Sequence, residues 1–267
     1  MVVTVVCFDV STLLATSLFQ AFDFRMNNEK NITNVSTLQI PKELMEALRG
    51  VGDKIKKTQK RNLENNLDPG DLSSIEFTQK EKIYLDTFCW LTETNEIVEN
   101  LNIVFFDLNL FKKKQSFIFE FSGGNIKNRF YLLLRTFFYE FFRIKEIFNI
   151  YLNKLRKRKL ITKIEASEIS LDFYRDYEFV FRLRNQLVHN YHIWHSDDHN
   201  EYIISEAAES MGYFFTNKES GEIIKSVDIA SKLASENLEG LPTLVTAIIE
   251  DLQNVLNIIC EGIEKEV

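Results

Sequence analysis

The feature that most constrains the fold is a long stretch, residues 126–157, in which apolar side chains recur every three or four positions. This spacing places them along one side of an α-helix. A helix of this length spans roughly 48 Å and needs other long elements to cover its apolar side. Glu140 and Arg143 interrupt the run, and we expect a surface or salt-bridging role for Glu140. The apolar positions are Phe130, Leu133, Leu134, Phe137, Phe138, Phe141, Ile144, Ile147, Phe148 and Tyr151.

Residues that interrupt helices are scarce, since the 267-residue chain contains 9 glycines and 3 prolines. The composition therefore predicts a mainly α fold, an antiparallel helical bundle with an additional N-terminal helical region. The other elements expected are helices at 41–67, 79–100, 227–237 and 243–264, a helix with a break at 103–121, and a small β-hairpin at 212–225.

Local signals indicate where several helices begin and end. Thr78–Glu81 and Thr162–Glu165 both have the capping-box form, in which a threonine and a glutamate together cap the first turn. The second box would begin the helix that leads to the functional motif described below. Gly240-Leu241-Pro242 predicts a break between the last two helices, because proline disturbs a helix interior.

The strongest internal boundary is Ser122–Asn125, which predicts a mostly helical N-terminal extension at 1–121 and a second helical domain at 124–267. Residues 1–22 are apolar but include Asp9 and no basic start, which favours a buried strand or helix over a signal peptide or membrane span. The three cysteines are odd in number and widely spaced, as is typical of thiols in a reducing cytosol. We therefore expect a cytoplasmic protein.

The formal net charge of −7 argues against indiscriminate binding to nucleic acid. A local basic cluster nevertheless lies near the end of the 126–157 helix. Its cations would contact RNA phosphates, or they would only complement the negative end of the helix dipole. We assign RNA binding to Lys154, Arg156, Lys157 and Arg158, and also to Arg182.

Residues 181–194, FRLRNQLVHNYHIW, combine side chains that suit phosphodiester chemistry. Arg184 is a permanent cation whose donors fit phosphate oxygens. His189 can give and take a proton near neutral pH. In an undistorted helix these two residues lie about 140° apart. Either the helix ends near Leu187, or a second chain completes the site, as in a symmetric dimer.

The segment Arg184-Asn185-Gln186-Leu187-Val188-His189 resembles the R-x4–6-H motif of the HEPN superfamily. Tyr191 extends the resemblance to the R-x4-H-x-Y form of HEPN toxins that are paired with minimal nucleotidyltransferase antitoxins. The resemblance covers the motif and a pair of helices at about 125–198. It implies a HEPN-like helical homodimer that cleaves RNA without a metal. It further implies that Arg184 and His189 are catalytic, that Asn185 supports them, and that an antitoxin modifies Tyr191.

We therefore expect a metal-independent endoribonuclease of the toxin or defence type, with RNA as substrate, no cofactor, and an antitoxin or regulatory partner. Three alternatives stay open. The chain could be an inactive HEPN-like module that binds nucleotide, RNA or a partner, or it could be a structural member of a defence complex. It could also be a metal-dependent hydrolase, although no familiar zinc spacing occurs among His189, His192, His195 and His199.

Overall fold

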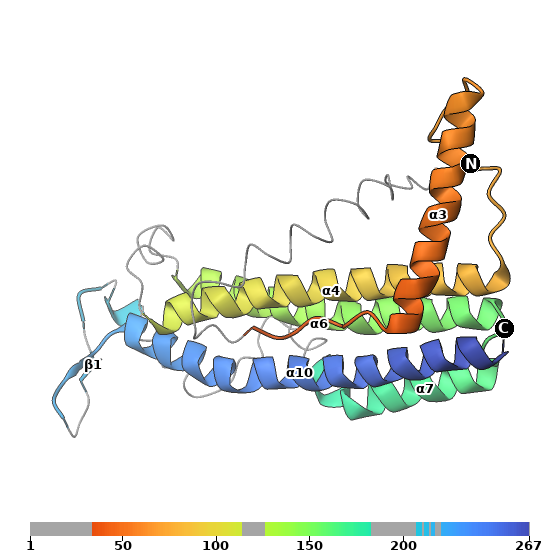
Figure 1. The fold of residues 1–267 in the computed structure, drawn as a ribbon. Coiled ribbons are helices and arrows are strands. Elements are labelled where there is room, and N and C mark those ends of the chain that lie inside the picture. The colour runs from red at the N-terminus through yellow and green to blue at the C-terminus, as the bar shows by residue number, and fades with distance from the viewer. Residues whose placement is uncertain are drawn as a thin grey trace, which may run out of the picture. The chain divides into compact units, whose positions relative to one another are not determined.

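The computed structural model describes residues 34–113, 126–182, 207–209, 211–213, 215–216 and 220–266. Within these residues the chain is mainly helical, which confirms the predicted mainly α class (Figure 1). The described residues fall into two compact units. The larger unit lies within residues 32–39 and 89–255, and the smaller within residues 40–88 and 256–267.

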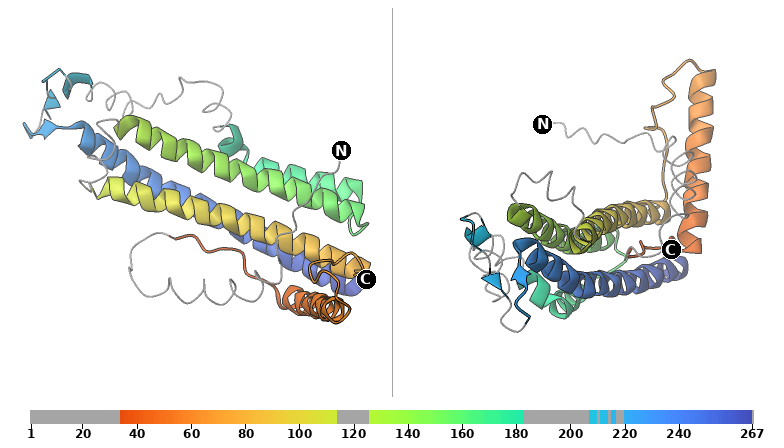
Figure 2. Two further views of the ribbon diagram at one scale, coloured as in Figure 1. Left: turned by 90° about the horizontal axis from the view of Figure 1, so that it is seen from above. Right: turned by 90° about the vertical axis from the view of Figure 1, so that its left-hand side faces the viewer.

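Long helices run side by side in the larger unit (Figures 1 and 2). The bounds of the 126–157 helix agree with those predicted from its apolar spacing. The described connection between α6 and α7 is short, residues 158–162, and the core of the unit consists of helix faces packed on one another. The helices are α4 (Gln79–Lys112), α6 (Ile126–Lys157), α7 (Lys163–Asp176) and α10 (Ser226–Glu266), of which α4 and α10 also extend into the smaller unit.

Aromatic contacts fix the direction of α4 relative to α6. Trp90 stacks on Tyr151 with 4.5 Å between ring centroids, and Phe105 lies 6.0 Å from Phe137. The contact with the higher residue number on α4 has the lower residue number on α6, so the two helices are antiparallel. They share one core although the boundary predicted at 122–125 lies between them. The predicted domain ranges, 1–121 and 124–267, stay a prediction.

The predicted end of a helix near residue 100 is wrong, because α4 continues to Lys112. No glycine or proline follows Asn100 within this helix. Its buried stripe also continues past that point, so packing against the rest of the larger unit favours a continuous helix. The buried positions beyond residue 100 are Leu101, Val104, Phe105, Leu108 and Phe111.

The break predicted at Gly240–Pro242 is also wrong, because α10 is one helix with Pro242 inside it. A proline in a helix interior costs about 3 kcal/mol, since it removes a hydrogen bond and its ring meets the preceding turn. Here the apolar face is buried on both sides of the proline, at Leu233 and Ala234 before it and at Val245 and Ile248 after it. Continuous burial offsets the local cost of the proline.

Residues Val227–Glu264 of α10 are long and apolar enough to cross a membrane, judged by length and composition alone. Core helices of soluble proteins share these properties. Val245, Ile248 and Leu252 of α10 are buried in the protein, and Tyr177 hydrogen-bonds to Asp251 on the same helix. Packing within the protein thus covers part of the apolar side of α10.

A short antiparallel strand pair precedes α10. β1 (Phe215–Thr216) pairs with β2 (Ile223–Ile224), with Phe215 opposite Ile224 and Thr216 opposite Ile223. Residues 217–219 lie outside the described residues, so the connection predicted as a β-hairpin stays a prediction.

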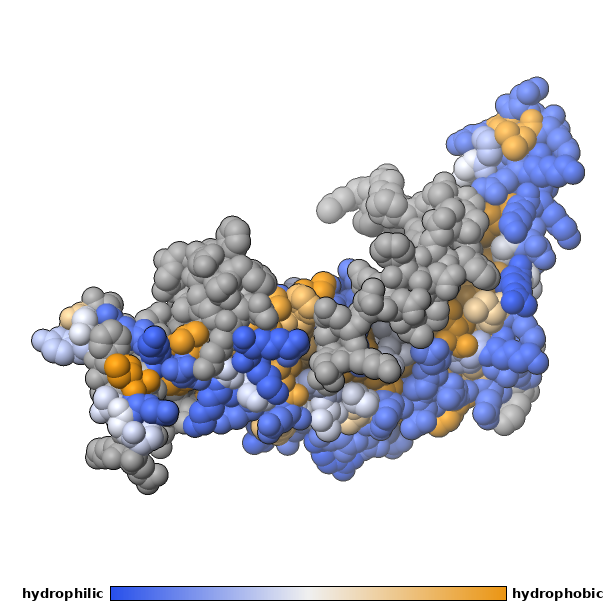
Figure 3. Space-filling view, turned by 60° about the vertical axis from the view of Figure 1, so that its left-hand side comes forward, coloured by the Kyte–Doolittle hydropathy of each residue, from blue (hydrophilic) through white to orange (hydrophobic). Residues whose placement is uncertain are grey.

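Apolar residues also reach the surface, as patches among hydrophilic residues in Figure 3. On α6 the most exposed large apolar residues are Leu132, Tyr139 and Ile150. Their spacing of seven and eleven residues places them within about 20° of one another around the helix axis. The outer face of α6 therefore carries an apolar stripe, made of these three residues.

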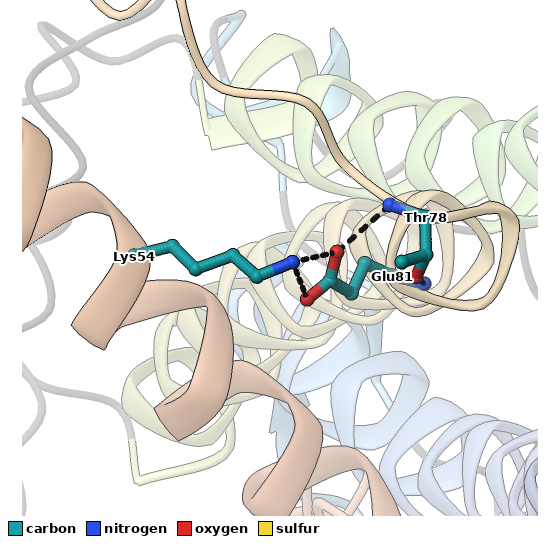
Figure 4. Close-up of polar contacts among 3 residues, drawn as sticks. All are labelled: Lys54, Thr78 and Glu81. Atoms are coloured by element: carbon teal, nitrogen blue, oxygen red, sulfur yellow. Dashed lines mark hydrogen bonds and ion pairs between the residues drawn. The ribbon is translucent and has the colours of Figure 1, made fainter.

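In the smaller unit, a capping box begins α4 and is bound by α3 (Lys42–Glu64) (Figure 4). The backbone N–H of Thr78 donates to Glu81 Oε2 at 2.8 Å, and that of Glu81 donates to Thr78 Oγ1 at 3.1 Å. These two bonds confirm the predicted box. Lys54 Nζ lies 2.6 Å from Glu81 Oε1 and 2.7 Å from Oε2. Burial tends to raise the pKa of Glu81, but the bonds from Lys54 and Thr78 outweigh burial and lower it.

The two described cysteines should react with thiol reagents at different rates. Cys89 is exposed, whereas Cys260 is buried. Burial, with smaller contributions from Glu43 and Glu264, raises the pKa of the Cys260 thiol to about 12. In a Cys7→Ser variant we expect Ellman's reagent at pH 8 to modify one thiol in the native protein and two after unfolding. Rapid modification of both thiols in the native protein would contradict this assignment.

Candidate functional site

The proposed catalytic residues follow directly after the described part of the second hairpin arm. Residues 183–206 lie outside the described residues, so Arg184, Asn185, His189 and Tyr191 do too. The same holds for the four histidines of the alternative metal site. The described residues therefore define the structure that leads to the motif, up to Arg182.

An antiparallel hairpin of α6 and α7 leads to the motif. The predicted capping box at Thr162–Glu165 is present and begins α7. α7 ends at Asp176, where Tyr177 forms a turn, and residues 178–182 continue as a further helical turn. The chain from 163 to 182 is thus a nearly continuous second arm that runs back along α6.

Aromatic contacts hold the second arm on α6. The ring of Phe148 lies 5.0 Å from that of Phe173, and the ring of Phe141 lies 6.2 Å from Tyr177 and 5.9 Å from Phe181. All five side chains are buried. Packing therefore fixes the arm as far as the residue before Arg182.

Tyr177 also connects the hairpin to α10. Its hydroxyl donates a hydrogen bond to Asp251 Oδ2 at 2.5 Å. Burial, followed by this bond and the charge on Asp251, raises the pKa of the Tyr177 hydroxyl. The hydroxyl therefore stays protonated at neutral pH and acts as a donor, which anchors the point where α7 is interrupted.

Lys145 of α6 lies within a group of aromatic rings from both arms. Its Nζ is 4.1 Å from the ring centroid of Tyr174, 5.0 Å from that of Phe181 and 5.4 Å from that of Phe142. These distances are typical of cation–π interactions. Burial lowers the pKa of Lys145, and Glu146 partly counters this. Lys145 was not predicted as a functional residue, although a single lysine among Phe141, Phe142 and Phe148 was a signal.

The arginines on this part of the hairpin are paired with carboxylates of their own helix. Arg182, the only predicted RNA-binding residue on the second arm, lies 2.7 Å from Glu178, and its side chain is 70% exposed. Arg143 lies 2.8 Å from the buried Glu140, which gives Glu140 the predicted salt-bridging role. Arg175 pairs with Asp172.

The structure does not bring the predicted RNA-binding residues together. Lys154, Arg156, Lys157 and Arg158 lie at the C-terminal end of α6 and in the turn after it. Phe181, next to Arg182, contacts Phe142 instead. Arg156 is 14 residues further along the helix than Phe142, or roughly 20 Å. Arg182 therefore lies near the middle of α6, roughly 20 Å from the basic cluster at the C-terminal end of that helix.

Among the described residues, no three His, Cys, Asp or Glu side chains are grouped closely enough to hold a metal ion. A hollow on the second arm is lined by Glu168, Leu171, Asp172, Tyr174, Arg175 and Glu178. Two of its carboxylates, Asp172 and Glu178, are the arginine partners described above. Comparison of the chain with protein-family models, curated proteins and solved structures finds no match.

Proposed function

We propose that this protein is a metal-independent endoribonuclease with a HEPN-like bundle, acting as a homodimer. The observation that carries the proposal is the α6–α7 hairpin, whose second arm is held in place up to Phe181. The motif Arg184–His189 begins three residues later. A rigid arm directly before a site is what precise positioning of catalytic groups requires.

The chemistry follows from the side chains of the motif. His189 of one protomer removes the proton from a ribose 2′-hydroxyl, and the resulting oxygen attacks the adjacent phosphorus. Arg184 stabilises the negative charge that develops on the phosphate oxygens. His189 of the other protomer protonates the departing 5′-oxygen. The products are a 2′,3′-cyclic phosphate and a 5′-hydroxyl, and no metal takes part.

A homodimer would bring catalytic groups together that a single helical motif holds apart. Residues five positions apart point about 140° away from each other on one helix, so one motif does not bring both groups to the same phosphate. Two motifs related by a two-fold axis supply two histidines and two arginines to a shared site. The apolar stripe of Leu132, Tyr139 and Ile150 is exposed surface of the kind that protein interfaces bury.

The remaining predicted residues take supporting roles in this proposal. Asn185 orients His189 or the phosphate, and Tyr191 donates a hydrogen bond at the site and is the position an antitoxin modifies. Arg182 contacts RNA near the motif. The basic cluster at the C-terminal end of α6 contacts RNA further along the strand. The enzyme would act on cytoplasmic RNA as a toxin or defence nuclease.

The proposal is tested by incubating the protein with total cellular RNA, and with single-stranded DNA of matched length, in the presence of EDTA. We expect cleavage of the RNA only, because DNA lacks the attacking 2′-hydroxyl. The upstream RNA fragments should end in 2′,3′-cyclic phosphates. These ends should therefore resist ligases that need a 3′-hydroxyl. Cleavage that stops with EDTA would support the metal-dependent alternative. If the folded dimer leaves the RNA intact, the result would support the alternative of an inactive module that only binds its ligand.

A further inference from the structure

We propose that the surface formed by α4 and α10 is a binding site for an extended peptide segment of a partner protein, and that residues 34–39 occupy it as an internal ligand. The site consists of the side-chain amides of Asn95, Asn102 and Gln253, together the amide clamp, and it lies entirely in the larger unit. The peptide that it selects has aliphatic side chains three positions apart. This inference is independent of the proposed ribonuclease activity.

Two asparagines of α4 each bind one residue of the segment through both of its backbone groups. The N–H of Val35 donates to Asn102 Oδ1 at 2.8 Å, and Asn102 Nδ2 donates to the carbonyl of Val35 at 3.0 Å. Asn95 binds Leu38 in the same way, at 2.8 Å and 3.1 Å. A side-chain amide that makes both bonds reproduces the pairing of a neighbouring antiparallel β-strand. The bonds therefore recognise backbone, which any extended peptide offers.

Gln253 of α10 binds a third residue of the segment. The N–H of Gln39 donates to Gln253 Oε1 at 2.7 Å, and Gln253 Nε2 donates to the carbonyl of Gln39 at 3.2 Å. Residues 34–39 thus lie on both α4 and α10 (Figure 1). Within the described parts of the chain they make no backbone–backbone hydrogen bond. Their release would therefore break no hydrogen bond of a described helix.

The spacing of the amide clamp on α4 matches an extended chain. Asn95 and Asn102 are seven residues apart, or about 10.5 Å along the helix, and only about 20° apart around its axis. Val35 and Leu38 are three residues apart, which is about 10 Å in an extended chain. A helical ligand would cover only about 4.5 Å over the same three residues. The clamp therefore selects extended peptides.

Two aliphatic side chains give the site its selectivity. Val35 is 5% exposed and Leu38 is 2% exposed. The residues beside and between them, Asn34, Ser36 and Gln39, are exposed. A charged side chain at either buried position would lose its hydration without a partner. Main-chain hydrogen bonds that supply affinity, with separate buried side chains that supply specificity, are how proteins recognise extended peptides of their partners.

The test uses the full chain with Val35→Asp and Leu38→Asp, which leaves the amide clamp intact and expels the internal ligand, since two unpaired carboxylates resist burial. The probe is a fluorescein-labelled peptide with blocked ends and the sequence of residues 34–39, NVSTLQ. We expect the double variant to bind it with a Kd on the order of 100 µM. Wild type should bind at least about tenfold more weakly, because its own segment competes at a high effective concentration.

Matched controls separate backbone recognition from general stickiness. Added to the double variant, Asn102→Leu should weaken binding about tenfold, because it removes two hydrogen bonds. Asn100→Leu makes the same change on another side of α4 and should leave the Kd within about twofold.

In the peptide, N-methylation of the leucine removes the N–H that Asn95 accepts and should weaken binding about tenfold. N-methylation of the serine is the control, since the N–H of Ser36 has no hydrogen-bond partner among the described residues.

Three results would overturn the inference. They are a folded double variant that does not bind the peptide, equal losses in the two asparagine variants, and equal losses for the two methylated peptides. If the double variant does not fold, hydrogen exchange in wild type decides. About 5 mM unlabelled peptide should displace residues 34–39 and speed exchange of the Leu38 amide. An unchanged exchange rate would show that residues 34–39 are a permanent part of the fold.

Discussion

Replacing His189 with alanine is expected to reduce RNA cleavage at least about 100-fold, because it removes both the general base and the general acid from the dimer. The folded protein should be unaffected if the histidine serves only catalysis. The measurement is the single-turnover rate on a fluorescent RNA in EDTA, together with the melting temperature of each variant. A loss of rate without a change in stability would assign proton transfer to this residue.

The matched control is His195→Ala, which removes an imidazole from the same short histidine cluster but lies outside the R-x4-H-x-Y segment. We expect its rate to stay within about threefold of wild type. Equal losses in the two variants would indicate that the histidine cluster acts as a whole, as the metal alternative requires. An unaffected His189→Ala variant would remove the motif from catalysis altogether.

The elements that could be predicted from the sequence are those specified by short-range patterns. The bounds of α6 could be predicted from the spacing of its apolar residues. A period of three and four residues that continues over 32 positions places these side chains on one face of a single long helix. The two capping boxes could be identified because each depends on residues three positions apart. Both boxes are present, at Thr78–Glu81 and at Thr162–Glu165.

The errors occurred where distant contacts override a local signal. Pro242 has a strong local preference against a helix interior, but the apolar face of α10 is buried on both sides of it. In α4 no glycine or proline marks an end near Asn100, and the buried stripe continues past that residue. A local propensity is worth at most a few kcal/mol, and burial of a long helix face outweighs it.

The surroundings of the candidate site were less predictable than the helices, because they depend on which helices meet. Tyr177 and Asp251 are 74 residues apart, and their hydrogen bond forms only because the end of α7 lies beside α10. Lys145 comes to lie among rings of both arms only because α6 and α7 are antiparallel. No short-range pattern contains that information. The motif itself, by contrast, is a local pattern, and its role as a catalytic site stays a prediction.

Replacing Phe148 with alanine is expected to lower the free energy of unfolding by about 3–5 kcal/mol. Phe148 is fully buried, with its ring 5.8 Å from that of Trp90 on α4 and 5.0 Å from that of Phe173 on α7. Its removal would leave a cavity where three helices meet, and α7 would lose an aromatic contact with α6. The measurement is equilibrium unfolding in urea, with the loss taken from the change in midpoint at constant slope.

Ile150→Ala on the same helix is the matched control, since its side chain is 55% exposed on the outer face of α6. It should cost less than about 0.5 kcal/mol in the monomer. In a dimer that buries the apolar stripe, Ile150→Ala would weaken association, so the stability of the variant would depend less on protein concentration than that of the wild type.

A small loss for Phe148→Ala would contradict the packing of α4, α6 and α7 around this ring. Because α7 leads directly to the motif, a large loss should be accompanied by reduced RNA cleavage.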